Sequence, residues 1–434
     1  MITLKNDSLS FSFPEIDEVI RCLIEQHIDS TLPAIIAANR TSAVQALRSS
    51  WRFREATPES RREAENQVIN ATPEEIETAL REKSMRVFGR GRASSTVLNI
   101  EFQRTLRIPD DGKIYPLPAG FGCFPLRHVD DYKDAVPAPW IERGGVLMPM
   151  YQSEALWIRF RTGYPFALKV AAGKINAVTG ELWQTELQAD PQNYIVLPEQ
   201  PWLDGFAVRK GVIRQFVAMP LGAGYSAEEQ ITGKADTGGI QLQVFPMRAE
   251  AYFRQQIEAR LPKSLEDLLS ELVDGILVSA ARHPGRLYRS LYSDRSSMVA
   301  EHCGMGLGAG GTMRQEIFKD RHHFSDWDLS TTGRCFVHLC NSLVWRQVTG
   351  SNPPHPPFTA KEYANAGVPW FDYYRDDLSA LSGSTVLDKV KSVVALGEAK
   401  GEKPLPDNSS IEPEFIVQYG NARRSDQVQE WVET

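Results

Sequence analysis

The first 91 residues carry hydrophobic side chains at helical spacing. Apolar residues between Ile16 and Ile24 recur at intervals of three and four, which predicts an amphipathic helix after Pro14. Thr-Pro dipeptides at 57–58 and 72–73 are followed by acidic residues, a pattern typical of helix starts. The sequence therefore predicts a helical N-terminal part over residues 1–91.

From about residue 92 the pattern changes to short alternating runs bounded by Gly and Pro. We expect strands in this part because the runs are rich in β-branched and aromatic residues. They lie at 96–102, 155–160, 166–170, 212–219 and 240–245. No long crossover helix separates them, which favours a mostly antiparallel sheet, a sandwich or a partial barrel over a parallel sheet.

Helical spacing returns near residue 248. The predicted helices span residues 251–260, 265–281, 332–348, 359–366 and 387–395, and Thr359 is the expected cap of the fourth. The predicted fold class is thus α+β, with a β-rich core at 92–247 and a helical C-terminal part at 248–396. A polar tail follows at 397–434.

Charge and cysteine content narrow the class of protein. The net charge of −7 argues against broad attraction to nucleic acid or to an anionic membrane. Five cysteines without a CxxC argue against a disulfide framework or zinc knuckle and favour a reducing compartment. The N-terminus lacks the pattern of a secretion signal, and the longest apolar stretch, near 275–281, is too short to span a membrane. We therefore expect a cytoplasmic protein with no membrane span.

Five glycines fall within the eight residues 304–311, and three of them form a G-x-G-x-x-G at Gly306, Gly308 and Gly311. A dinucleotide fingerprint also needs a strand before the glycines and a long helix after them, and neither is predicted here. We expect instead a glycine loop that packs against another element, or a nest of N–H groups that binds an anion. The three glycines are candidate ligand-binding residues.

The segment after the glycine run is rich in metal-ligand types. His322, His323, Asp326 and Asp328 could ligate a divalent metal such as Fe, Mn or Zn, and His322 and Asp326 would share a face if the segment were helical. Adjacent histidines rarely ligate one ion, because their side chains diverge. The alternative is an exposed loop in which Asp328 or Ser330 caps the next helix.

The predicted helix at 332–348 has a polar stripe beside its apolar one. Arg334, His338, Asn341 and Trp345 fall on neighbouring turns of this stripe. His338 is a candidate acid or base, and Asn341 and Trp345 are candidate ligand contacts. The alternative is a helix face turned to solvent, although His and Trp are usually partly buried.

Arg214 and Gln215 are polar residues inside an apolar strand, so one of them faces inward if both faces of the strand are covered. A buried Arg needs a carboxylate partner, and Asp204 or Glu199 is nearest in sequence. The pair could clamp a ligand, or it could be an internal ion pair. Arg314 is a second candidate for holding an anionic group.

Four segments of the chain resemble a known group of proteins. They are Pro201-Trp-Leu-Asp-Gly205, Ile213-Arg-Gln-Phe-Val-Ala-Met-Pro-Leu-Gly222 with Gly224-Tyr225, Gly238-Gly-Ile-Gln-Leu242 and Pro369-Trp-Phe-Asp-Tyr-Tyr374. Similar segments occur in an uncharacterised family of bacterial and fungal proteins, some of which carry a membrane-protein label. The resemblance covers about residues 95–375 and implies no activity, and the hydropathy of the chain contradicts the membrane label.

Three functions compete at this point. The first is a binding protein that holds a small-molecule or peptide ligand against the sheet and the glycine run. The second is an enzyme, metal-dependent in one version, in which Arg214 or Arg314 holds an anionic group. The third is a membrane-active, toxin-like protein. The first two predict that the glycine run, His338 and Arg214 surround one cavity.

Overall fold

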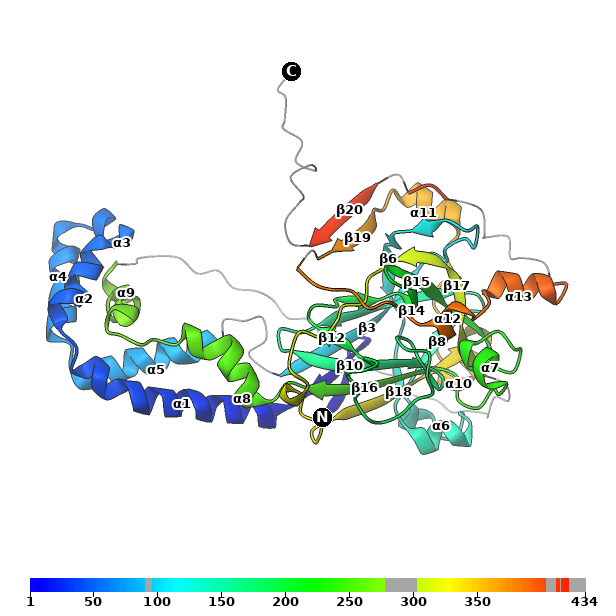
Figure 1. Ribbon diagram of the computed structural model, residues 1–434, viewed down its shortest axis with the longest axis horizontal. Helices are drawn as coiled ribbons and strands as arrows, with labels where there is room; N and C mark the ends of the chain where they lie inside the picture. The colour runs from blue at the N-terminus through cyan, green and yellow to red at the C-terminus, as the bar shows by residue number, and fades with distance from the viewer. Residues whose placement is uncertain (90–95, 278–302, 376, 403–410, 414, 421–434) are drawn as a thin grey trace, which may run out of the picture. The chain divides into compact units, whose positions relative to one another are not determined.

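The computed structural model describes residues 1–89, 96–277, 303–375, 377–402, 411–413 and 415–420. The chain forms two compact units (Figure 1). Residues 1–12, 97–246 and 295–434 make up one unit, here named the sheet unit. Residues 13–96 and 247–294 make up the other, the helical unit. The fold is α+β with a large, mostly antiparallel sheet that does not close, which confirms the predicted class.

The helical unit begins with a long amphipathic helix, as the apolar spacing predicts. Ile20, Ile24 and Ile28 of this helix are fully buried. Helices also start at the two predicted Thr-Pro sites, where the Thr57 hydroxyl accepts a hydrogen bond from the backbone N–H of Ser60. The α-helices are α1 (Pro14–Ile36), α2 (Arg40–Ser49), α3 (Trp51–Glu55), α4 (Pro58–Asn70), α5 (Pro73–Gly89), α8 (Ala249–Tyr252) and α9 (Leu269–Leu277).

Short turns of other helix types link the last helices of this unit. A π-helical turn at Phe253–Ile257 and a 3₁₀ turn at Glu258–Arg260 continue α8, so the predicted helix at 251–260 is helical throughout. A 3₁₀ turn at Glu266–Leu268 leads into α9, while residues 278–281 of the predicted helix lie outside the described residues. None of the described helices has both the length and the apolar character needed to cross a membrane.

Long strands lie side by side through the sheet unit in the order β2, β3, β9, β15, β17, β18, β16, β10 and β12, and all of these pairings are antiparallel. Parallel pairs join β8 to β18 and β4 to β17. The bounds are β1 (Ile2–Lys5), β2 (Ser8–Ser12), β3 (Val97–Thr105), β4 (Ile114–Tyr115), β6 (Gly120–Cys123), β7 (Arg127–His128), β8 (Val146–Met150), β9 (Ala155–Arg161), β10 (Phe166–Ala172), β11 (Ile175–Asn176), β12 (Ile195–Leu197), β13 (Trp202–Leu203), β14 (Gly205–Arg209), β15 (Val212–Pro220), β16 (Ile240–Pro246), β17 (Gly304–Arg314) and β18 (Gly333–Asn341).

The glycine run is a strand, so the loop predicted for residues 304–311 is wrong. β17 pairs with β15 from Met305 to Arg314, with a break in register at Gly310 and Gly311. The even-numbered glycines of the run recur every second residue and therefore share one face of the strand. On that face a Cβ at Gly306 would lie 2.9 Å from Cβ of Ser226, and a Cβ at Gly308 would lie 2.8 Å from the Tyr225 carbonyl oxygen. Glycine is needed here because another part of the chain packs directly on the backbone.

The helix predicted for 332–348 is also wrong in its first half. Residues Gly333–Asn341 form β18, and only Ser342–Thr349 form a helix, α10. β18 lies between β16 and β8, and most of its side chains are buried on both faces. A strand covered on both faces is apolar at nearly every position, which hides its period of two in the sequence.

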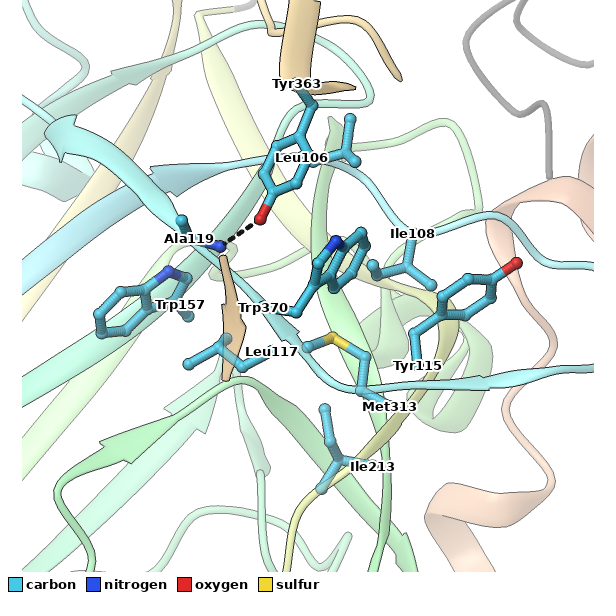
Figure 2. Packing of buried hydrophobic residues seen from close by; sticks show 10 residues of the cluster. All are labelled: Leu106, Ile108, Tyr115, Leu117, Ala119, Trp157, Ile213, Met313, Tyr363 and Trp370. Atoms are coloured by element: carbon cyan, nitrogen blue, oxygen red, sulfur yellow. Dashed lines mark hydrogen bonds between the residues drawn. The ribbon is translucent and has the colours of Figure 1, made fainter. Parts of the chain in front are cut away.

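A second, three-stranded sheet packs on a cluster of large apolar side chains. It contains β5 (Leu117–Pro118), β19 (Trp370–Tyr374) and β20 (Ile416–Gly420). Figure 2 shows Trp370 and Tyr363 within this cluster, where the Tyr363 hydroxyl accepts a hydrogen bond from the Ala119 backbone N–H at 2.8 Å. The remaining helices of the unit are α6 (Ala138–Arg143), α7 (Ala227–Thr232), α11 (Ala360–Ala366), α12 (Thr385–Asp388) and α13 (Val393–Ala399), with 3₁₀ turns at Val129–Tyr132 and Phe324–Asp326. Thr359 caps α11, as predicted.

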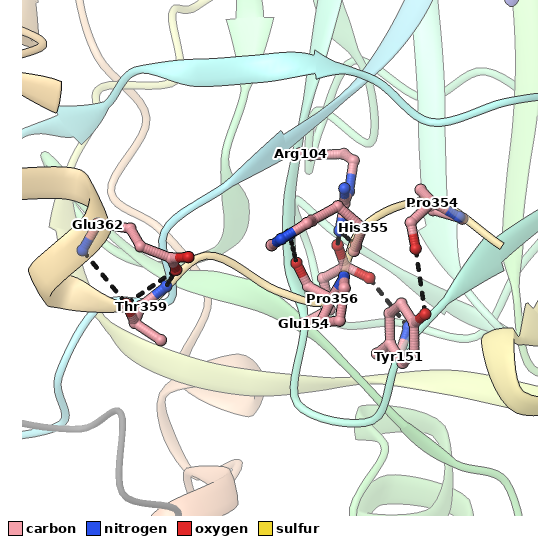
Figure 3. A network of polar contacts seen from close by, with 8 residues as sticks. All are labelled: Arg104, Tyr151, Glu154, Pro354, His355, Pro356, Thr359 and Glu362. Atoms are coloured by element: carbon pink, nitrogen blue, oxygen red, sulfur yellow. Dashed lines mark hydrogen bonds and ion pairs between the residues drawn. The ribbon is translucent and has the colours of Figure 1, made fainter.

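A buried ion pair fixes the proline-rich segment that leads to α11 (Figure 3). Arg104 of β3 pairs with Glu154, and both side chains are almost fully buried. The guanidinium also donates to the His355 carbonyl oxygen at 2.5 Å, and the Tyr151 hydroxyl donates to the Pro354 carbonyl oxygen at 3.1 Å. Because two backbone carbonyls of the segment are bound to these side chains, its course depends on the ion pair.

Candidate functional site

His338 lies inside the fold rather than on an open polar face. Its Nε2 is 2.9 Å from the Gly144 carbonyl oxygen, so Nε2 carries a proton and donates it. The ring stacks on Trp140 with 4.8 Å between ring centroids and is only 3% exposed. Burial lowers the pKa of His338 to about 4, against the weaker opposing effect of the Gly144 carbonyl. The imidazole is therefore neutral near pH 7.

Gln215, not Arg214, is the inward-facing residue of its strand. The Gln215 side-chain oxygen accepts a hydrogen bond from the Ile108 backbone N–H, and its amide nitrogen donates one to the Leu106 carbonyl oxygen. Arg214 makes no ion pair with Asp204 or with any other carboxylate among the described residues, so the predicted internal ion pair is wrong. Glu199, the other expected partner, pairs instead with Arg321.

Asp204 is fully buried in the sheet unit. Neither carboxyl oxygen makes a hydrogen bond of good geometry with a described residue. Burial raises the pKa of Asp204 well above its usual range, and the Trp202 side chain offsets this only in part. Burial therefore favours the neutral form of this carboxyl, and no arginine among the described residues pairs with it.

The three pieces expected around one cavity are spread along the sheet. Arg214 is opposite Thr312, whereas Leu339, the neighbour of His338, is opposite Met305. Seven residues of β17 separate these two positions, which corresponds to about 23 Å of extended chain. Arg314, at the end of the same strand, is bound to Asp372 at 2.6 Å. The structure thus does not bring His338, Arg214 and the glycine run into one site.

The histidine and aspartate segment is held by its own backbone. The Asp328 carboxylate accepts the backbone N–H groups of Ser330 and Thr331, so it closes a turn before β18 and caps no helix. His323 Nδ1 is 2.7 Å from the Ser325 hydroxyl. Among the described residues no group of three or more His, Cys, Asp and Glu side chains is placed to hold a metal ion. The metal site predicted at His322, His323, Asp326 and Asp328 thus has no support from side-chain placement in the described residues and stays a prediction.

Asn341 and Trp345 stabilise the fold around α10. Asn341 caps α10 by accepting the Leu343 backbone N–H at 3.0 Å. Trp345 is 1% exposed and packs among apolar side chains that include Trp140. Neither residue lines a described cleft.

A different set of residues forms a cleft with aromatic walls. Its volume is about 440 Å³, and it is lined by Trp157 of β9, Trp202 of β13 and Phe371 of β19. Leu117, which Figure 2 shows beside Trp157, contributes apolar surface. The two tryptophan rings approach edge to face, with 6.5 Å between centroids. We refer to this site as the tryptophan cleft.

Strand pairing places arginines in the same cleft. Trp157, Arg159 and Arg161 alternate along β9 and so project from one face. Arg159 is directly opposite Glu101 on one neighbouring strand and Trp202 on the other. Such opposite residues have Cβ atoms about 5 Å apart, so the arginine and the indole are neighbours in the wall.

The wall also contains a polar group without a partner. Trp157 is 9% exposed, and its indole N–H makes no hydrogen bond with a described residue. Gly120 backs this ring, since a Cβ at Gly120 would lie 3.3 Å from Cζ2 of Trp157 and 2.8 Å from the Gln103 side-chain oxygen. A buried donor without an acceptor costs about 1–3 kcal/mol.

A second, larger cleft of about 790 Å³ lies beside the 320–328 segment and includes His322, Tyr194 and Asp320. The Asp320 carboxylate there accepts the Tyr194 hydroxyl at 2.6 Å, the Trp327 indole N–H at 2.7 Å and the His322 backbone N–H at 2.8 Å. With three donors already bound, this carboxylate is used by the fold. The tryptophan cleft is the stronger candidate, because its lining combines aromatic rings with two arginine side chains.

The sequence analysis did not single out Trp157, Arg159 and Arg161 as site residues, although their alternation with Leu156, Ile158 and Phe160 is visible in the sequence.

Comparison of the chain with protein-family models, with curated proteins and with solved structures finds no match. The resemblance of segments 201–205, 213–222, 238–242 and 369–374 to an uncharacterised family therefore stays a prediction.

Proposed function

We propose that this chain is a ligand-binding protein that holds a small, flat molecule in the tryptophan cleft. The observation that carries the proposal is a cleft walled by Trp157, Trp202 and Phe371, with two arginines in its lining. Ligand sites are typically concave, mainly apolar and aromatic, and equipped with a few polar groups that orient the ligand. The tryptophan cleft has each of these properties.

The dimensions of the cleft limit the ligand. A volume of about 440 Å³ lies near the lower end of the range for small-molecule sites, so one or two fused rings fit better than a long peptide. A flat ring system can lie against Trp157 and Trp202 and bury apolar surface there. An acceptor on the ligand, such as a carbonyl oxygen, would accept a hydrogen bond from an arginine of the lining.

The proposal is tested with 2-naphthamide, which combines two fused rings with a carbonyl acceptor. A probe of this size is expected to bind with a Kd on the order of 0.1–1 mM, a range suited to ligand-observed NMR. Trp202→Ala should abolish binding, because it removes one wall of the cleft. Trp202 is only partly buried, so the fold should tolerate the change.

Trp51→Ala is the matched control, since Trp51 belongs to the helical unit and is 66% exposed. It should leave binding unchanged. Equal binding by the wild type and Trp202→Ala would show that the probe uses another site and would refute the proposal. The enzyme and membrane-active hypotheses stay predictions, to be tested by metabolite screening and by liposome leakage.

A further inference from the structure

Among the described residues, two positively charged side chains and only one negatively charged side chain interact at the tryptophan cleft. Arg159 and Arg161 line it, and its lining contains no carboxylate. The nearest acid, Glu101, is 8% exposed on the adjacent strand, and it serves both arginines. Two guanidinium groups thus share one carboxylate, which leaves about one positive charge uncompensated at the cleft.

The two arginines use Glu101 differently. Arg161 donates a hydrogen bond to one carboxylate oxygen of Glu101. Gln103 donates to the other oxygen at 3.3 Å. Arg159 approaches that second oxygen only to 3.8 Å, which is an ion pair without a hydrogen bond. Its side chain is 48% exposed, and none of its guanidinium donors is bound to a described residue.

Cross-strand pairing then sets what Arg159 can reach. Trp202 is its direct neighbour on β13, and Trp157 precedes it by two residues on the same face of β9. A guanidinium presents its donors in a planar fork that matches a carboxylate. The free donors of Arg159 are therefore positioned beside a slot for a flat ring, and one net positive charge is balanced by one negative charge on the ligand.

We infer that the ligand of the tryptophan cleft is a flat aromatic molecule carrying one carboxylate, with the ring against Trp157 and Trp202 and the carboxylate on Arg159. The inference rests on the proposed function and adds the charge of the ligand to it. It accounts for the two features of the wall that the fold leaves unused, the free arginine donors and the aromatic slot.

Three probes of equal ring size and different charge test the inference. They are 2-naphthoate, neutral 2-naphthamide and cationic 2-naphthylmethylamine at pH 7. Titrations of the full chain, followed by ligand-observed NMR, should show 2-naphthoate binding about ten times more tightly than the amide, and the amine binding more weakly than the amide. The preference for the anion should shrink as sodium chloride is raised, because the arginine is half-exposed.

Arg159→Gln should reduce the affinity for 2-naphthoate to that for the amide and leave the amide affinity unchanged. Arg209→Gln is the matched control, because Arg209 is an exposed arginine with a long ion pair that lies outside the cleft. It should alter neither affinity. Circular dichroism and the unfolding midpoint establish that each variant is folded.

The outcomes separate the two proposals. If the three naphthyl probes bind equally, or if Arg159→Gln keeps the preference for the anion, the inference about charge is wrong while the cleft stays a ligand site. If no probe binds, or if Trp202→Ala binds all three as the wild type does, the proposed function itself is wrong.

Discussion

The buried imidazole of His338 predicts a specific response of the sheet unit to acid. The pKa of His338 is about 4 in the folded chain, against 6.5 for an unperturbed histidine, because burial disfavours the imidazolium. The folded state therefore stays neutral at His338 while the unfolded chain takes up a proton below pH 6.5. This contribution to stability is fully present above pH 6.5 and is lost as the pH falls to about 4.

The size of the effect follows from the two pKa values. A difference between 6.5 and about 4 corresponds to a loss of roughly 3 kcal/mol on going from pH 7 to pH 4. At pH 4.5 the loss should be roughly 2–3 kcal/mol. We expect His338→Gln to remove it, because glutamine does not titrate and its amide can still donate to the Gly144 carbonyl oxygen. At pH 7 the variant should be less stable than the wild type by about 1 kcal/mol, since stacking on Trp140 is lost.

Urea unfolding followed by tryptophan fluorescence measures this response. Of the nine tryptophans only Trp51 belongs to the helical unit, and it is already 66% exposed, so the signal reports mainly on the sheet unit. The difference in unfolding free energy between pH 7 and pH 4.5 should be smaller by roughly 2–3 kcal/mol in His338→Gln than in the wild type. His128→Gln, at an exposed histidine, should leave the difference unchanged. Parallel pH profiles for the wild type and His338→Gln would refute the reasoning, as would an NMR titration of His338 near pH 6.5.

Three further substitutions test the packing of the sheet unit. Glu154→Gln leaves the buried guanidinium of Arg104 without a counter-ion and should cost about 3–5 kcal/mol in urea unfolding; a cost below about 1 kcal/mol would show that the pair is not desolvated. Asp204→Asn removes an acid whose pKa is raised in the folded chain. In the wild type this acid lowers the unfolding free energy as the pH rises above about 3.8. The variant should therefore lose less unfolding free energy between pH 4 and pH 8, again measured by urea unfolding. Gly311→Ala places a Cβ 2.3 Å from a backbone carbonyl oxygen and should lower the unfolding free energy by about 1–3 kcal/mol or more. Gly304→Ala is the control, because the nearest atom to its Cβ would be 3.9 Å away. Its unfolding free energy should be within about 0.5 kcal/mol of the wild type.

Local signals in the sequence predict the helices well. The Thr-Pro starts at 57–58 and 72–73 and the Thr359 cap appear in the structure where the sequence places them. These features depend on residues within one turn of each other, so no tertiary information is needed. The alternating strands also predict the antiparallel character of the sheet, because side-chain periodicity is a local property.

Long-range packing explains the two errors in the predicted elements. The glycines of β17 alternate as strand residues do, but the need for glycine comes from Ser226 and Tyr225, about 80 residues earlier in the chain. β18 shows no clear period because partners from β16 and β8 bury both of its faces. In each case the deciding contacts join residues far apart in sequence.

The candidate site could not be predicted from the sequence either, because its walls also depend on contacts between residues far apart in the chain. One wall of the tryptophan cleft is visible as the alternation of Trp157, Arg159 and Arg161. The opposite wall comes from Trp202 and Phe371, and only the folded sheet brings them next to β9. Conversely, the histidines and glycines that suggest chemistry in the sequence are used to build turns and close contacts.

The hairpin β1–β2 pairs with β3, although residues 13–96 separate β2 from β3 in the sequence. Ser12 at the end of β2 is the register partner of Val97 at the start of β3, and the Phe13 N–H donates to the Thr96 carbonyl oxygen at 3.0 Å. The chain therefore leaves the sheet after β2 and re-enters it at the adjacent position of β3. Replacing residues 13–96 with a two-residue Asn-Gly turn would keep the ladder continuous at this point. Residues 247–294 belong to the same helical unit, so a segment grafted at this junction would have to replace them as well.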